Sequence, residues 1–203
     1  MLRLTLVRHG STEWNEAGRF QGWGDPPLSA RGRAEADHLH RVIGGERFDR
    51  VVTSGLIRAR ETAAIALPGA AIDSDERLRE MGFGAWDGLT WAECEARDGD
   101  LIRRWVDDPS AVSPPDGEST AVFEARIAAA LADLPARGDH LWVVHAGVIH
   151  AILARWMEIP LRRTFALHLS ACGITRAELF EGGARVVCVN ESAPKIAPRT
   201  PST

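Results

Sequence analysis

Two histidines and two arginines follow apolar runs whose composition is typical of buried strands. In chain order they are Arg8, His9, Arg58 and His145, behind the runs at residues 2–7, 51–53 and 141–144. A neutral imidazole is a good nucleophile toward phosphorus, and an arginine fork bonds two phosphate oxygens at once. Glycines near both histidines allow the backbone to approach a ligand closely. The set therefore predicts a phosphate site at which a phosphoryl group is transferred.

The departing oxygen of a phosphate ester needs a proton, and one carboxylic acid is a candidate source. Glu80 lies among apolar residues and loop glycines in the stretch 78–84. Burial there would raise its pKa, so that it could protonate the leaving group and later activate water. The phosphoryl charge must be held by arginine and histidine. The single lysine, Lys195, lies in a Pro-rich tail, which argues against a P-loop or Schiff-base lysine.

Helices and apolar strands alternate along the chain and must position these residues. Beyond the three runs above, the spacing predicts helices over about 29–43, 56–67, 90–99, 101–108, 119–134 and 148–157, and late strands over 173–179 and 184–189. This alternation predicts an α/β fold, a three-layer sandwich with a mostly parallel central sheet and the late strands as a hairpin or antiparallel edge. Ligands of such sheets bind beyond the carboxyl ends of the strands, where the four residues are expected.

The composition is that of an ordinary soluble globular protein. The chain has 203 residues and a net charge of −4, which gives no general attraction to nucleic acid or to anionic membranes. It shows no apolar run of about 18 residues and no signal peptide, and its cysteines lack a C-x-x-C pair, which suits a reducing compartment. We expect a cytoplasmic protein with one catalytic domain over 1–192 and a disordered Pro-rich tail over 193–203.

Five motifs, in order, resemble those of the histidine phosphatase superfamily, also called phosphoglycerate-mutase-like. The first is LVRHG at 6–10, continued by Thr12, Trp14, Asn15 and GRFQG at 18–22. The others are SGLIRA at 54–59, LRE at 78–80, GES at 117–119 and VHAG at 144–147. Together they cover almost all of residues 2–190, which makes the resemblance far more specific than one Arg-His-Gly.

The resemblance implies a role for each site residue. His9 would be the phosphorylated nucleophile and Glu80 the proton donor. The residues that would hold the phosphoryl group are Arg8, Asn15, Arg58 and His145. The resemblance also implies a phosphoglycerate-mutase-like sandwich and chemistry without a metal or another cofactor. Ser11, Gly55 and Ala146 depart from common family residues, but none of them replaces a group with a chemical role.

The stretches at 78–88 and 145–149 are most similar to the α-ribazole phosphatases of cobalamin synthesis. The expected substrate is therefore a small phosphorylated metabolite, with α-ribazole 5′-phosphate as the candidate. The residues expected to line the substrate pocket are Gln21, Gly22, Trp23 and Trp86. His150 is assigned a structural role. The oligomeric state stays open, a homodimer included.

Three other functions remain as alternatives. A phosphoglycerate mutase of the same fold is disfavoured because the stretch from Glu80 to His145 is short for one. A non-catalytic phosphate-binding module is disfavoured because the complete set of site residues is present. A metal-dependent hydrolase is disfavoured because the sequence has no H-E-x-x-H or comparable cluster.

Overall fold

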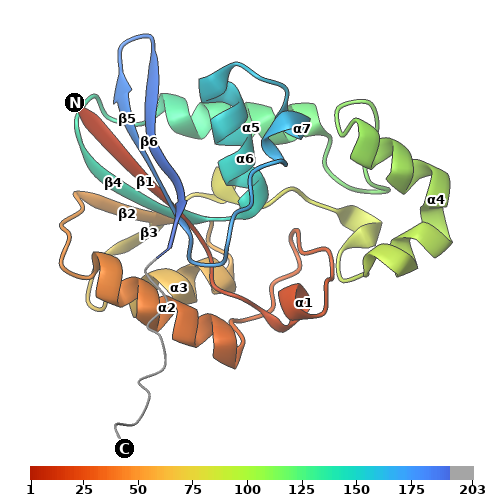
Figure 1. Ribbon diagram of the computed structural model, residues 1–203, viewed down its shortest axis with the longest axis horizontal. Helices are drawn as coiled ribbons and strands as arrows, with labels where there is room; N and C mark the ends of the chain where they lie inside the picture. The colour runs from red at the N-terminus through yellow and green to blue at the C-terminus, as the bar shows by residue number, and fades with distance from the viewer. Residues whose placement is uncertain (193–203) are drawn as a thin grey trace, which may run out of the picture.

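A six-stranded sheet forms the middle of the protein in the computed structural model, which describes residues 1–192. In sequence order the strands are β1 (Leu2–Arg8), β2 (Arg50–Thr53), β3 (Ile72–Ser74), β4 (Gly138–Val144), β5 (Ile174–Phe180) and β6 (Gly183–Glu191). Their order across the sheet is β3-β2-β4-β1-β5-β6 (Figure 1). The first four of these are parallel to one another, while β5 and β6 form an antiparallel hairpin beside β1. The predicted mostly parallel sheet with an antiparallel edge is confirmed.

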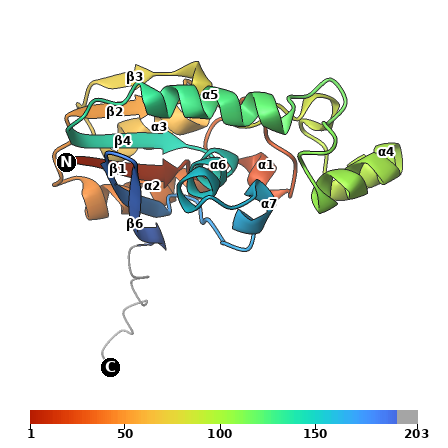
Figure 2. The ribbon, with the colours of Figure 1, turned by 90° about the horizontal axis from the view of Figure 1, so that it is seen from above.

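Helices cover both faces of the sheet. The main helices are α2 (Ala30–Ile43), α3 (Ile57–Ala66), α4 (Trp91–Asp107), α5 (Thr120–Ala132) and α6 (Ala146–Met157), and the short ones are α1 (Glu13–Glu16), α7 (Leu161–Thr164) and the 3-10 turns η1 (Glu76–Leu78) and η2 (Gly84–Trp86). Helices α2 and α3 lie on one face, and α5 and α6 lie on the other (Figures 1 and 2). The three-layer sandwich is confirmed.

Alternation along the strands explains the two cores. In β4, Trp142 and Val144 join the cluster under α5 and α6, whereas Leu141 and Val143 join the cluster under α2 and α3. Successive side chains of a strand point to opposite faces, so an unbroken apolar run is what a strand covered on both faces requires. Each face of the sheet is therefore covered by a core of its own.

Three helices begin at a serine or threonine whose side chain caps the first turn. Ser29, Thr90 and Ser119 each accept a hydrogen bond from a backbone N–H in the first turn of α2, α4 and α5. The two helices expected over 90–99 and 101–108 are both present within α4, which is broken at Asp98, whose φ of −134° and ψ of 40° are not helical. Strand β3 and helices α1 and α7 were not predicted, because they are too short to show a period.

A third, smaller core lies between α4 and the loop before it, away from the sheet. Trp86 is completely buried there, its ring about 6 Å from those of Phe20 (6.1 Å) and Trp105 (5.9 Å), and its indole N–H donates to Asp98. A side chain with no exposed surface cannot contact a substrate. The prediction that Trp86 lines the substrate pocket is therefore wrong, and the residue anchors α4 instead.

Two sequence-based expectations concern the C-terminal tail and the limit of the catalytic domain. The tail predicted to be disordered, 193–203, lies outside the described residues, and the domain limit at residue 192 stays a prediction. Across residues 1–192, no helix is both long and apolar enough to span a bilayer.

Candidate active site

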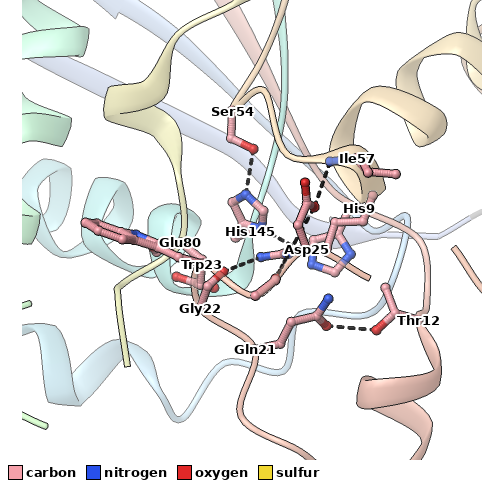
Figure 3. A network of polar contacts seen from close by, with 12 residues as sticks. His9, Thr12, Gln21, Gly22, Trp23, Asp25, Ser54, Ile57, Glu80 and His145 are labelled. Atoms are coloured by element: carbon pink, nitrogen blue, oxygen red, sulfur yellow. Dashed lines mark hydrogen bonds and ion pairs between the residues drawn. The ribbon is translucent and has the colours of Figure 1, made fainter. Parts of the chain in front are cut away.

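Three parallel strands end at the same edge of the sheet and bring the predicted residues together. Arg8 pairs in register with Val144, and the His9 N–H donates to the Val144 carbonyl at 2.9 Å. This register places His9 beside His145, with ring centroids 5.1 Å apart and planes 60° apart (Figure 3). Both rings are at least 96% buried, with exposed fractions of 4% and 0%.

The His9 ring is held as a nucleophile would need to be. Its Nδ1–H donates to the Gly10 carbonyl at 2.7 Å. A neutral imidazole has one N–H, so Nε2 keeps its lone pair. Burial lowers the pKa of His9 well below 6.5, and the charges of Arg58 and Arg8 lower it further. His9 is therefore neutral near pH 7, with its free nitrogen on the side away from the backbone.

The two ring nitrogens of His145 have different hydrogen-bond partners. The Nε–H of Arg58 donates to Nδ1 at 3.3 Å, which leaves the ring proton on Nε2, 2.7 Å from the Ser54 hydroxyl. Burial, followed by the charge of Arg58, lowers the pKa of His145 well below 6.5. Because a hydroxyl can donate as well as accept, Ser54 also permits the other tautomer. In that tautomer Nδ1 no longer accepts from Arg58 and can present its own N–H to a phosphoryl oxygen.

Arg58, at the start of α3, is buried completely and holds three acceptors. Besides the bond to His145, its terminal nitrogens donate to the carbonyls of Gly22 and Gly24, each at 2.8 Å. Burial lowers the pKa of Arg58 to about 10, so it remains a cation at neutral pH. Asp25 lies 3.9 Å from it and accepts the Ile57 N–H at 2.8 Å, which ties the loop to α3 (Figure 3).

The loop that holds Arg58 is itself held by Asp87, a residue the sequence analysis missed. The carboxylate accepts the backbone N–H groups of Gly22, Trp23 and Gly24 at 2.5, 3.0 and 3.2 Å. Gly22 must be glycine, since a Cβ there would lie 2.4 Å from the Met81 carbonyl oxygen. Asp87 stands 65 positions from Gly22, and no local pattern predicts this contact.

Of the buried polar atoms without a partner among residues 1–192, two are donors that lie at this site. They are Nε of Arg8 and Nε2 of Gln21. Another nitrogen of Arg8 donates to the Leu169 carbonyl at 2.6 Å, and the Gln21 carbonyl oxygen accepts from the Thr12 hydroxyl at 2.8 Å. The free amide nitrogen of Gln21 points toward the His9 ring (Figure 3). Because buried donors are nearly always paired, both are suited to receive an anionic ligand.

Asn15 lies in α1 and takes part in the cap of that helix. Its Oδ1 accepts the Thr12 N–H at 3.1 Å, and its own N–H donates to the Thr12 hydroxyl at 3.2 Å. The carbonyl half of the amide is therefore used locally, and the NH₂ half is the part that could reach a phosphate. Its role there stays a prediction.

The carboxyl group of Glu80 lies beside the N-terminus of α6. Its Oε1 accepts the Met81 N–H at 2.9 Å and its Oε2 accepts the Gly147 N–H at 3.0 Å. Burial raises the pKa of Glu80, although these two N–H groups and the nearby Arg58 and Arg8 act in the other direction. A raised pKa is what a carboxylic acid needs to donate a proton near neutral pH.

Two of the remaining candidates lie at the edge of the site. Trp23 is 52% exposed, donates its indole N–H to the Glu80 carbonyl at 3.0 Å and lines a surface hollow with Ser119. A contact of Trp23 with substrate stays a prediction. His150 is 92% buried, with an exposed fraction of 8%, and lies edge-on to Phe165 at 5.3 Å, which is consistent with the structural role assigned to it.

The geometry presents one neutral imidazole nucleophile, one buried and one half-buried arginine, a second imidazole and a buried carboxylic acid. Among residues 1–192, no three His, Cys, Asp or Glu side chains are grouped so that they could hold a metal ion. The model of the "Histidine phosphatase superfamily (branch 1)" matches residues 4–192. The chain belongs to the histidine phosphatase superfamily.

Several histidine phosphatases are similar to this chain over nearly their whole length. The adenosylcobalamin/α-ribazole phosphatase of Salmonella typhimurium strain LT2 is 32% identical over 197 residues, 95% of this chain and 98% of that protein. The crystal structure of the α-ribazole phosphatase from Shigella flexneri matches with a TM-score of 0.85 at 27% identity, covering 94% and 96% of the two chains. Phosphoserine phosphatase from Entamoeba histolytica, solved with 3-phosphoglyceric acid, matches with a TM-score of 0.85 at 26% identity over 95% and 98%. The predicted family and its likeness to α-ribazole phosphatases are confirmed.

Proposed function

We propose that this histidine phosphatase hydrolyses a small phosphate monoester in two steps through a phosphohistidine on His9. In the first step the Nε2 lone pair of His9 attacks phosphorus and the ester P–O bond breaks. The departing oxygen takes the proton of Glu80, so an alcohol leaves and Glu80 becomes a carboxylate. Arg8, Arg58 and His145 hold the phosphoryl oxygens, whose charge such donors stabilise in a loose transition state.

The second step regenerates the enzyme. The Glu80 carboxylate takes a proton from water, whose oxygen attacks phosphorus while the P–N bond breaks. The electron pair of that bond returns to Nε2 of His9, and inorganic phosphate leaves. The same carboxyl group thus serves first as acid and then as base.

One observation carries this proposal: the tautomer of His9. Its Nδ1–H is committed to the Gly10 carbonyl, and its pKa is low, so Nε2 is free and unprotonated at neutral pH. Donors without partners, on Arg8 and Gln21, are buried at the same site.

The test is to trap the intermediate. Wild-type protein is mixed with a ³²P-labelled phosphomonoester, quenched within milliseconds and digested at alkaline pH, where phosphohistidine survives. The label should map to the peptide that contains His9, and His9→Ala should show neither label nor turnover while keeping its melting temperature near that of the wild type. A label on His145, or none in a single turnover, would refute the mechanism.

For the substrate we propose α-ribazole 5′-phosphate. This choice is supported by the likeness to the Salmonella and Shigella α-ribazole phosphatases. A panel that includes phosphoserine and the phosphoglycerates tests it by kcat/KM, and product analysis distinguishes hydrolysis from transfer to a second hydroxyl group, which a mutase would perform. A cytoplasmic location is part of the proposal; a homodimer and the absence of nucleic-acid or membrane partners stay predictions.

A further inference from the structure

A buried ion pair lies behind the loop that carries Glu80. Arg126, in α5, donates from Nε to Oε1 of Glu118 at 2.7 Å and from Nη2 to Oε2 at 2.8 Å. The side chains are 16% and 6% exposed, respectively. Glu118 also accepts the Gly82 N–H at 3.3 Å. Such a parallel, two-bond arrangement fixes the guanidinium plane.

The remaining donors of Arg126 all point to one stretch of backbone. Nη1 donates to the carbonyls of Arg77 and Arg79, both at 2.6 Å, and Nη2 donates to the carbonyl of Glu80 at 2.9 Å. With the two bonds to Glu118, Arg126 makes five hydrogen bonds. An arginine has five N–H groups, so none remains free.

This arrangement fixes a segment that no regular structure supports. Residues 79–82 lie between the turns η1 and η2 and pair with no strand. Arg126 and Glu118 hold the carbonyl of Glu80 and the N–H of Gly82 on one side. The Glu80 carboxyl lies toward α6 and accepts the Gly147 N–H at 3.0 Å. The position of the carboxyl therefore depends on the backbone behind it.

The ion pair between Arg126 and Glu118 also helps Glu80 to remain protonated. A lone buried arginine behind Glu80 would favour the ionised carboxylate, because a nearby opposite charge stabilises the charged form. Glu118 balances that charge. Arg126 can then bind the carbonyls firmly while Glu80 keeps its proton.

We propose that Arg126 and Glu118 are positioning residues that align Glu80 with the leaving oxygen. The proposal deepens the function proposed above and rests on the role of Glu80 as the acid. It places a specific part of catalysis, the protonation of the leaving group, under the control of two residues that contact the backbone of the Glu80 loop and not its carboxyl group.

The test compares two leaving groups in the burst phase, which reports formation of the phosphoenzyme. Glycerol 2-phosphate releases a poor leaving group that needs a proton, whereas p-nitrophenyl phosphate releases a good one that hardly needs it. Arg126→Lys keeps the charge but presents its N–H groups from one atom, so it cannot span three carbonyls and a carboxylate. A displacement of about 1 Å can lower a rate about 100-fold. We expect a loss of roughly 10- to 100-fold with glycerol 2-phosphate and less than about threefold with p-nitrophenyl phosphate.

Three further variants make the outcome decisive. Arg60→Lys, an exposed arginine on α3, should change neither rate. Glu118→Gln keeps the shape of its side chain and should give the same contrast at a smaller size, and it decides the matter if Arg126→Lys does not fold. Equal losses with both substrates, or no loss with either, would overturn the inference. If Glu80→Gln shows the contrast and the Arg126 and Glu118 variants do not, only this inference fails; if Glu80→Gln shows none, the proposed role of Glu80 fails first.

Discussion

The substitution Gly147→Ala tests whether catalysis requires Glu80 to lie close to helix α6. A Cβ at this position would lie 2.2 Å from Oε1 of Glu80 and 3.0 Å from its Cδ. The shortest favourable carbon–oxygen contacts are about 3.3 Å, so the carboxyl must retreat by about 1 Å. It cannot do so without weakening its bond to the Gly147 N–H, at 3.0 Å, or to the Met81 N–H, at 2.9 Å.

Two magnitudes follow from this displacement. A misplacement of about 1 Å can lower the rate of a step about 100-fold, and the step affected is protonation of the leaving group. Loss of one of these hydrogen bonds, which leaves a buried N–H without a partner, costs about 1–3 kcal/mol of stability, and alanine in a helix returns about 1 kcal/mol relative to glycine. The free energy of unfolding should therefore fall by no more than about 2 kcal/mol, too little to unfold the protein.

The assay is the burst rate with glycerol 2-phosphate and with p-nitrophenyl phosphate, together with urea denaturation. We expect a loss near 100-fold with the first substrate and a few-fold with the second. Gly45→Ala is the matched control, because a Cβ at Gly45 meets no atom within 4 Å, and it should alter neither rate. Wild-type burst rates in Gly147→Ala would show that the carboxyl does not act from the position seen here.

Three further predictions concern the charges of the site. Arg58→Lys should lower kcat/KM at least roughly tenfold to a hundredfold, since an ammonium cannot bond Gly22, Gly24 and a phosphoryl oxygen together; near-normal steady-state kinetics would place Arg58 outside the pocket. Overnight dialysis against EDTA should leave the activity unchanged, and a loss restored by Mg²⁺ or Zn²⁺ would contradict a mechanism built on arginine and histidine. The raised pKa of Glu80 means that the folded state holds this proton more tightly than the unfolded state, so stability from this group is lost as pH rises through the folded pKa. The melting temperature of Glu80→Gln relative to wild type should therefore increase from pH 5 to pH 8, and a difference that stays constant would mean that the pKa is not raised.

Most of the residues that carry chemistry could be predicted because they follow a strand, whereas Glu80 was predicted from its apolar surroundings. Arg8, His9 and His145 lie at the ends of buried apolar runs, and parallel strands bring their carboxyl ends to one edge. Local pattern and topology were sufficient to bring them together. The starts of the helices expected at 29 and 119 could be predicted as well, because Ser29 and Ser119 cap them through backbone N–H groups only three residues away.

The supporting residues could not be predicted, because their partners are distant in sequence and their own surroundings are ordinary. Asp87 looks like any loop aspartate until Gly22 is placed beside it, and Arg126 looks like a surface arginine of an amphipathic helix. Trp86 was misjudged for a related reason. A tryptophan in a glycine-containing loop can lie at a pocket or under a helix, and only the position of α4 distinguishes the two.

The place of β1 in the sheet has a consequence for how the protein is made. Strand β1 is synthesised before both of its neighbours in the sheet, β4 and β5, which end at residues 144 and 180. At synthesis rates of about 5–20 residues per second, β5 follows β1 by roughly 10–35 s. Until β4 has been made, roughly 7–27 s after β1, the apolar strand that ends in Arg8 has neither neighbour. The nucleophile is thus synthesised well before its surroundings are complete, so chains that stop before β5 should have no phosphatase activity and should depend on chaperones to stay soluble.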